Sequence, residues 1–152
     1  MIKKLFFSAV LFFCISLSSQ EAIQQWVYNM LERAQINVDK GNLEQAEKSY
    51  KENADGSYSN NSYDHFVILR TYAYFLLSQD RNKEALTYLK KANTKRRMPE
   101  YDVFMLKFTL GQVLYVDAQR GEAKKAFLEW VQIGTKNNFD LRPEGYATLA
   151  TI

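Results

Sequence analysis

The sequence predicts an all-α protein made of antiparallel helix hairpins that stack as repeats. Three observations lead to this fold class. The 152 residues include only six glycines and two prolines, a composition that favours helices. Apolar residues recur at three-and-four spacing, as on one face of an α-helix. The same arrangement of small and large residues also returns about every 39 positions.

Two sets of small residues mark the repeat. The first set is Ala34, Ala73, Gly111 and Ala150, which are spaced by 39, 38 and 39 positions. The second set is Ala46, Ala85 and Ala123, which are spaced by 39 and 38 positions. Because two independent markers share one period, we infer three copies of a unit and the beginning of a fourth. The predicted copies span residues 27–60, 66–99, 104–137 and, in part, 143–152.

Each copy is expected to contain two helices joined by a tight turn. In the second copy, for example, the apolar spacing predicts helices over 67–78 and 84–92. In the first turn Gly41 can adopt the left-handed backbone that ends a helix. The predicted turns lie at 40–42, 79–82 and 118–121. The polar joins between copies lie at 53–64, 93–101 and 134–143.

The small residues are expected to have a packing role. Two antiparallel helices approach closely only where neither projects a long side chain, so the two sets should lie at the contact within each hairpin. Large residues follow four positions after the second set, at Tyr50, Leu89 and Phe127, and should fill the space between neighbouring hairpins. One hairpin cannot bury its apolar faces alone, so the copies must stack.

Three stretches of the chain carry a pattern of small and large residues found in a known class of repeats. They run from Gly41 through Ala46 to Tyr50, from Glu84 through Leu89 to Ala92, and from Leu110 through Ala123 to Phe127. This pattern resembles the tetratricopeptide repeat family over residues 22–152, and the resemblance implies a right-handed α-solenoid. The period exceeds the family's usual length of about 34 residues. The residues that depart from the family pattern are Arg33, Asn37 and Trp130.

The resemblance also implies which residues contact a partner, because the family's first helices line a concave groove. The matching positions in the second and third copies are Arg70, Tyr74, Leu77, Phe108, Gln112 and Tyr115, and those in the first copy are Tyr28, Leu31, Gln35 and Val38. Aromatic residues are enriched in binding hot spots, so we expect Tyr74, Phe108 and Tyr115 to contribute most. The implied partner is a protein or peptide that binds as an amphipathic helix or an extended segment.

Residues 1–19 have the layout of a secretory signal peptide. Lys3 and Lys4 precede an uncharged, mostly apolar run over 5–17, and small polar residues follow. This run is about thirteen residues long, whereas a helix that crosses a bilayer needs roughly twenty. We therefore expect residues 20–152 to form an exported domain without an integral membrane span, in a bacterial periplasm or outside the cell. Retention of the N-terminus as a membrane anchor is the alternative.

Charge and cysteine content narrow the function classes. The chain carries 20 basic and 17 acidic residues, and loss of Lys3 and Lys4 leaves 18 against 17, a net charge of +1. Near-neutrality argues against a nucleic-acid binder and against a binder of anionic membranes. The one cysteine, Cys14, lies within the expected signal peptide, so packing rather than disulfides should stabilise the exported domain.

The sequence carries no familiar catalytic or cofactor motif. It has no glycine-rich phosphate loop, no Gly-x-Ser-x-Gly elbow and no His-Glu-x-x-His helix. The single histidine, His65, lacks thiols or an acidic pair at metal-ligand spacing and is interpreted as a residue at a helix start. We therefore expect no enzyme activity, no cofactor and no metal.

A basic run is the sharpest charge feature outside the expected groove. Lys95, Arg96 and Arg97 form a candidate anion-facing patch for an acidic partner or a lipid headgroup. The alternative is structural, because cations at the end of a helix offset the partial negative charge of its unpaired carbonyls.

The C-terminal partial repeat offers a second kind of surface. Tyr146, Leu149 and Ile152 form an apolar stripe, where a terminal repeat normally presents a polar face. Self-association through this helix is therefore an open hypothesis.

The leading functional hypothesis is an exported scaffold that holds a protein partner in a bacterial cell-envelope complex. Two alternatives stay open. The chain is a helical accessory domain of a larger envelope enzyme or binding protein, or it is a structural unit that assembles with its own copies through the partial repeat. A repeat motif specifies a fold rather than a partner, so function follows from the resemblance only as a class.

Overall fold

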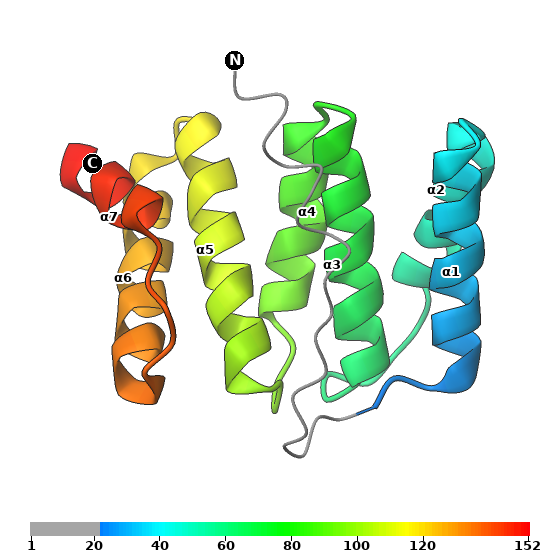
Figure 1. The fold of residues 1–152 in the computed structure, drawn as a ribbon, viewed down its shortest axis with the longest axis horizontal. Helices are drawn as coiled ribbons and strands as arrows, with labels where there is room; N and C mark the ends of the chain where they lie inside the picture. The colour runs from blue at the N-terminus through cyan, green and yellow to red at the C-terminus, as the bar shows by residue number, and fades with distance from the viewer. Residues whose placement is uncertain (1–21) are drawn as a thin grey trace.

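The structure, a computed structural model, describes residues 22–152, and every regular element in that range is an α-helix (Figure 1). The predicted all-α class is confirmed. The expected signal peptide, 1–19, lies outside the described residues. The helices are α1 (Gln25–Asp39), α2 (Leu43–Ala54), α3 (Tyr63–Ser78), α4 (Asn82–Asn93), α5 (Glu100–Val116), α6 (Arg120–Asn137) and α7 (Pro143–Thr151).

The helices pack in chain order. The turns bring α1 against α2, α3 against α4 and α5 against α6, and these three pairs make the most extensive contacts. Between pairs, α2 packs on α3, α4 on α5 and α6 on α7. Figure 1 shows the first six helices standing roughly parallel, with α7 tilted across the far end from α1. Within residues 22–152, no helix is both long and apolar enough to cross a membrane.

The three hairpin turns share one backbone geometry. Each contains a residue with left-handed φ, at 77° in Gly41 and 59° in both Asp80 and Ala118. These positions are 39 and 38 residues apart, which is the period of the small-residue markers. The residue that follows donates its N–H to the carbonyl five positions earlier, as in a Schellman cap. These bonds join Asn42 to Asn37 (2.8 Å), Arg81 to Leu76 (3.0 Å) and Gln119 to Leu114 (2.9 Å).

The small residues of the three complete copies are buried, and Gly111 lies at a contact between the two helices of its hairpin. Ala34, Ala46, Ala73, Ala85 and Ala123 are all fully buried. Gly111 on α5 is the tightest case, because an added Cβ would lie 3.0 Å from the ring of Phe127 on α6. The large residues Tyr50, Leu89 and Phe127 are buried too, and the Tyr50 ring packs on those of Tyr72 and Phe75 in the next hairpin.

The end of the domain around α7 departs from the regular pattern for a steric reason. Trp130 on α6 stands where the repeat pattern predicts a small residue, and its side chain is fully buried. The chain makes room with Gly145 on α7, where an added Cβ would lie 2.5 Å from the indole ring. Tyr146 packs edge-on to the same ring at 5.7 Å.

The C-terminal stripe is only partly exposed as a result. Leu149 and Ile152 pack against the buried aromatic cluster of α5 and α6, while Tyr146 remains 45% exposed. Tyr146 is therefore the most exposed residue of the stripe, while Leu149 and Ile152 are half-buried.

Candidate protein-binding face

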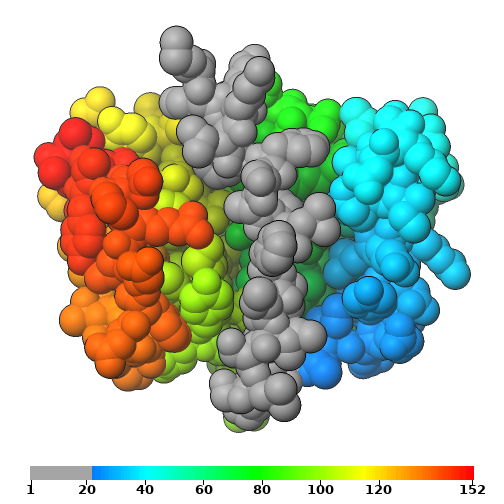
Figure 2. All heavy atoms as spheres, in the orientation of Figure 1, coloured from blue at the N-terminus to red at the C-terminus, as the bar shows by residue number. Residues whose placement is uncertain are grey.

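The six predicted contact residues of the second and third copies lie on two helices. Arg70, Tyr74 and Leu77 are on α3, and Phe108, Gln112 and Tyr115 are on α5. Both triplets have i, i+4, i+7 spacing, so each triplet follows one side of its helix. We call these two helix sides together the candidate face. Figure 2 shows α1 and α2 at one edge of the molecule and α7 at the other.

Arg70 is bound to a neighbouring helix. Its Nη1 lies 2.5 Å from Oδ1 of Asp102 on α5, and the Tyr63 hydroxyl donates to Oδ2 of the same carboxylate at 2.8 Å. The guanidinium also lies over the Phe66 ring, 5.2 Å from its centroid. The side chains of Arg70 and Asp102 are only 12% and 10% exposed. We call Arg70, Asp102 and Tyr63 the Arg70 cluster.

In the Arg70 cluster, the positive charge of Arg70 is balanced by the negative charge of Asp102. Burial by itself would lower the pKa of Arg70, but the neighbouring Tyr74 and Asp102 outweigh it, and the pKa lies above its ordinary value. Arg70 therefore stays a cation that is paired within the protein. It ties the second hairpin to the third, and its charge is not available to a partner.

Tyr74 makes a second, weaker link between α3 and α5. Its hydroxyl lies 3.4 Å from Oγ1 of Thr109, and that hydroxyl donates to the Met105 carbonyl at 3.2 Å. Since Thr109 already donates to Met105, Tyr74 is placed to donate to Thr109. The tyrosine ring is half-buried, so part of it faces outward.

Of the other four predicted contact residues on α3 and α5, three are at least partly exposed and one lies in the interior. Gln112 and Leu77 are half-buried, and Tyr115 is 36% exposed with its hydroxyl 3.5 Å from Oγ1 of Thr151 on α7. Phe108 is only 4% exposed and packs on Phe127 and Trp130. Its side chain therefore belongs to the interior of the third hairpin, and we leave it out of the candidate face.

Two residues of this region were missed by sequence reasoning. Asp102 and Thr109 on α5 are both buried, and each binds a predicted contact residue of α3. A signal for Asp102 was present, because an arginine within an apolar helix needs a counter-charge when it is buried. The sequence alone could not say which of the chain's 17 acidic residues supplies it.

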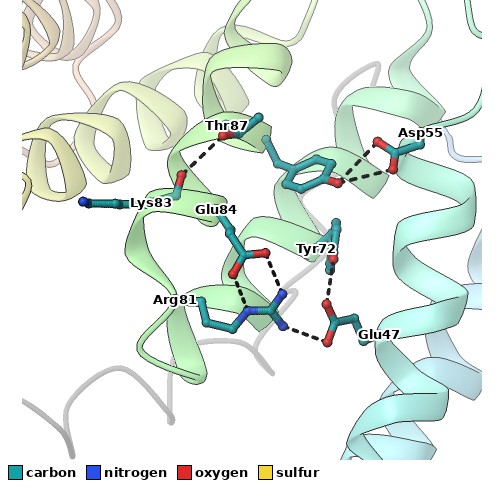
Figure 3. Close-up of polar contacts among 8 residues, drawn as sticks. Glu47, Asp55, Tyr72, Arg81, Lys83, Glu84 and Thr87 are labelled. Atoms are coloured by element: carbon teal, nitrogen blue, oxygen red, sulfur yellow. Dashed lines mark hydrogen bonds and ion pairs between the residues drawn. The ribbon is translucent and has the colours of Figure 1, made fainter.

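A second polar cluster joins the first hairpin to the second. Figure 3 shows the Arg81 guanidinium between Glu84 and Glu47, with N···O distances of 2.7 Å to each carboxylate. The Tyr72 hydroxyl donates to Glu47 at 3.1 Å. Hydrogen bonds from Arg81 lower the pKa values of Glu47 and Glu84. We call Arg81, Glu47, Glu84 and Tyr72 the Arg81 cluster.

His65 has a structural position at the join between α2 and α3. Its Nε2 lies 2.9 Å from the Ala54 carbonyl, which closes the end of α2, and its ring stacks on Tyr58 with a centroid distance of 4.3 Å. Burial is the main cause that lowers the pKa of His65. No group of three or more His, Cys, Asp or Glu residues suited to a metal occurs in the described part of the chain.

Two surface hollows are lined by residues other than those of the candidate face. One, of about 390 Å³, is lined by Asp80–Glu84 with Val116 and Asp117, and another, of about 650 Å³, is lined by Gly41–Gln45. Both sit at hairpin turns.

The candidate face is thus a set of half-exposed aromatic, amide and aliphatic groups on α3 and α5, held in place by buried polar links beneath it. Searches against protein family models, curated protein sequences and solved structures found no match to this chain.

Proposed function

We propose that this chain is a helical-repeat scaffold that holds a protein or peptide partner on the candidate face. In this proposal the three hairpins and α7 form a right-handed α-solenoid of the tetratricopeptide type, and α1, α3 and α5 line its concave side. The observation that carries the proposal is the recurrence of one left-handed Schellman turn at Gly41, Asp80 and Ala118, 39 and 38 residues apart. Equal units joined by equal turns stack into a continuous surface.

The chemistry of the candidate face favours binding over catalysis. Its one arginine is neutralised by Asp102 beneath the surface, so neither group can move a proton or hold an anion without breaking a buried pair. The groups left for a partner are Tyr74, Leu77, Gln112 and Tyr115. Tyrosine supplies large contact area at low entropic cost, and an amide supplies orientation, as in helix-in-groove recognition.

The signal peptide expected at residues 1–19 supports a proposed compartment. With a cleavable signal, the scaffold works outside the cytoplasm, and we propose a bacterial cell-envelope complex as its setting. A partner there is held by apolar and aromatic contact rather than by charge steering. Such binding depends only weakly on ionic strength.

Affinity capture with paired variants tests this proposal. The tagged full-length chain is expressed in its own organism, beside Gln112→Ala/Tyr115→Ala and a control, Lys124→Ala/Leu128→Ala. The control residues are exposed on α6, away from the candidate face. We expect one protein to be captured by the wild type and the control but lost, by about tenfold or more, with the first variant. Equal capture by all three chains would contradict the proposed binding face.

Retention of fold is checked in the same samples. Neither substituted pair belongs to the Arg70 cluster or the Arg81 cluster, and all four residues are at least partly exposed. Circular dichroism and the thermal midpoint should therefore match those of the wild type within error. A variant that loses helicity is replaced by the single change Gln112→Glu, which keeps the side-chain shape and adds a charge to the face.

A further inference from the structure

The segment between α4 and α5, residues 94–99, carries three consecutive cations that no carboxylate of residues 22–152 neutralises. We call it the basic join. Arg96 and Arg97 are exposed and Lys95 is half-buried, and within residues 22–152 none of the three forms an ion pair. The two lysines that precede the join differ from them. Lys90 pairs with Glu122 at 2.8 Å, and Lys91 pairs with Asp55 at 3.1 Å.

Three carboxylates, at the start of the α2–α3 join, in the first turn of α3 and in the first turn of α5, are already engaged. Asp55 accepts hydrogen bonds from Lys91 and from the Tyr88 hydroxyl. Asp64 accepts the backbone N–H of Gln24 at 2.9 Å, and Glu100 pairs with Lys136 at 2.9 Å. The positive charge of the join is therefore left without an internal counter-charge from these three acids.

The basic join is also held in a fixed shape. The Arg96 N–H donates to the Asn60 carbonyl at 2.9 Å, and Lys95 Nζ donates to the Ser59 carbonyl at 3.2 Å. Met98 is buried, and Arg97 has a left-handed backbone with φ of 59°. The two exposed arginines therefore extend from an anchored backbone, which reduces the ordering cost of binding.

Helix-end stabilisation does not account for these cations. At the end of α4 the Lys91 carbonyl accepts from both the backbone N–H and the hydroxyl of Thr94, and the Ala92 carbonyl accepts from the Lys95 N–H at 3.0 Å. Lys90 and Lys91 already place cations in the last turn. Arg96 and Arg97 lie beyond these groups, and within residues 22–152 their side chains donate no hydrogen bond to a helix carbonyl.

The charge of Lys95 in the basic join affects the nearby side chain of His65. Burial is the largest cause that lowers the pKa of His65, and Lys95 and Lys91 lower it further. The positive charge of Lys95 therefore adds to the effect of burial on the pKa of His65.

We propose that the basic join is a docking site for an acidic peptide segment, a short run rich in Asp and Glu in a partner protein. Planar guanidinium groups match carboxylates bidentately, and two of them are exposed side by side in sequence. A membrane surface fits less well, since lipid-binding clusters have about four to eight cations. The join also has no exposed large apolar residue to insert, because Met98 points into the core. This site is independent of the proposed binding face on α3 and α5.

Fluorescence anisotropy with a labelled decapeptide of alternating Glu and Ala tests the proposal on the full chain. Arg96→Glu/Arg97→Glu reverses the two exposed charges. Lys124→Glu/Lys125→Glu makes the same net change at two exposed residues of α6 that form no ion pair in the described chain. We expect the first variant to weaken peptide binding by about tenfold or more. The control should change it by about twofold or less, as expected for a distant charge.

A second variant guards against misfolding. Arg96→Gln/Arg97→Asn removes both charges, and Asn tolerates the left-handed backbone at position 97. It should also lose the peptide while keeping the thermal midpoint of the wild type. The proposal is overturned if the wild type does not bind the peptide, or if both charge-reversed variants lose it equally. It is overturned too if vesicles with phosphatidylserine bind through Arg96 and Arg97 while the peptide does not.

Discussion

The Arg70 and Arg81 clusters use the same three groups in two different settings. Each contains an arginine, a tyrosine hydroxyl and carboxylate groups, one in the Arg70 cluster and two in the Arg81 cluster, and each ties neighbouring hairpins together. In the Arg70 cluster the two charged side chains are 12% and 10% exposed, whereas Arg81 and Glu47 are 33% and 28% exposed. Because water screens the second pair more than the first, the loss of one partner should cost far more in the Arg70 cluster.

The largest effect is expected for Asp102→Ala. This change leaves Arg70 as a buried cation without a counter-charge, so it should lower the free energy of unfolding by roughly 3 to 5 kcal/mol. Urea denaturation followed by circular dichroism measures this difference. The double variant Arg70→Met/Asp102→Leu, which replaces the pair with apolar groups, should recover most of the loss. A loss of about 1 kcal/mol or less for Asp102→Ala would show that the pair is effectively solvated.

The matching change in the other cluster, Glu47→Ala, should have a smaller effect. Arg81 keeps its two hydrogen bonds to Glu84, and its guanidinium stays accessible to water. We expect the free energy of unfolding to fall by about 1 kcal/mol. The same urea experiment checks it, and the comparison of the two clusters fails if Glu47→Ala costs as much as Asp102→Ala.

The lowered pKa of Glu47 should be visible in the pH dependence of the free energy of unfolding. Its hydrogen bond from Arg81 is the main cause that holds the pKa of Glu47 below its ordinary value of 4.5, against the opposing effect of burial. A lowered folded-state pKa means that the contribution of Glu47 is fully present above about pH 4.5 and is lost as the pH falls through the folded-state value. The difference in stability between the wild type and Glu47→Gln, measured from neutral pH downward, should therefore shrink only below that point. Shrinkage between neutral pH and about pH 5 would contradict the assignment.

The smallest effect concerns the turns within the three hairpins, which share one backbone geometry. Ala118 adopts a left-handed φ of 59° that costs an ordinary residue about 1 to 2 kcal/mol, while glycine adopts it freely. Because glycine also gains entropy in the unfolded chain, Ala118→Gly should raise stability by only about 0.5 kcal/mol. The thermal midpoint measures the change, and Gly41→Ala at the matching turn should shift it the opposite way.

Much of the fold could be predicted from the sequence because residues of similar size recur at matching positions of the repeat. Small residues at Ala34, Ala73 and Gly111 mark close helix contacts, and Gly41 marks a turn through its own backbone freedom. The left-handed conformations of Asp80 and Ala118 follow from the same turn, but their residue types do not show it. At these two turns, position in the repeat indicates the left-handed backbone better than residue type does.

The candidate face was harder to predict because it depends on contacts between repeats. Spacing along a helix placed Phe108 beside Gln112 and Tyr115, yet the bulk of Trp130 and the close approach of α7 at Gly145 enclose Phe108. The pairing of Arg70 with Asp102 spans 32 residues. The sequence indicates that Arg70 needs a counter-charge but not which residue supplies it, and the enclosure of Phe108 has no local signal.

Site-specific photocrosslinking in living cells tests the proposed binding face most directly. A photoreactive phenylalanine analogue replaces Gln112 on α5 in one chain and Lys124 on α6 in another. The account predicts one discrete covalent adduct with a second protein from position 112 and none from position 124. An adduct from position 124 alone, equal adducts from both positions, or none from either would contradict binding on the face of α3 and α5.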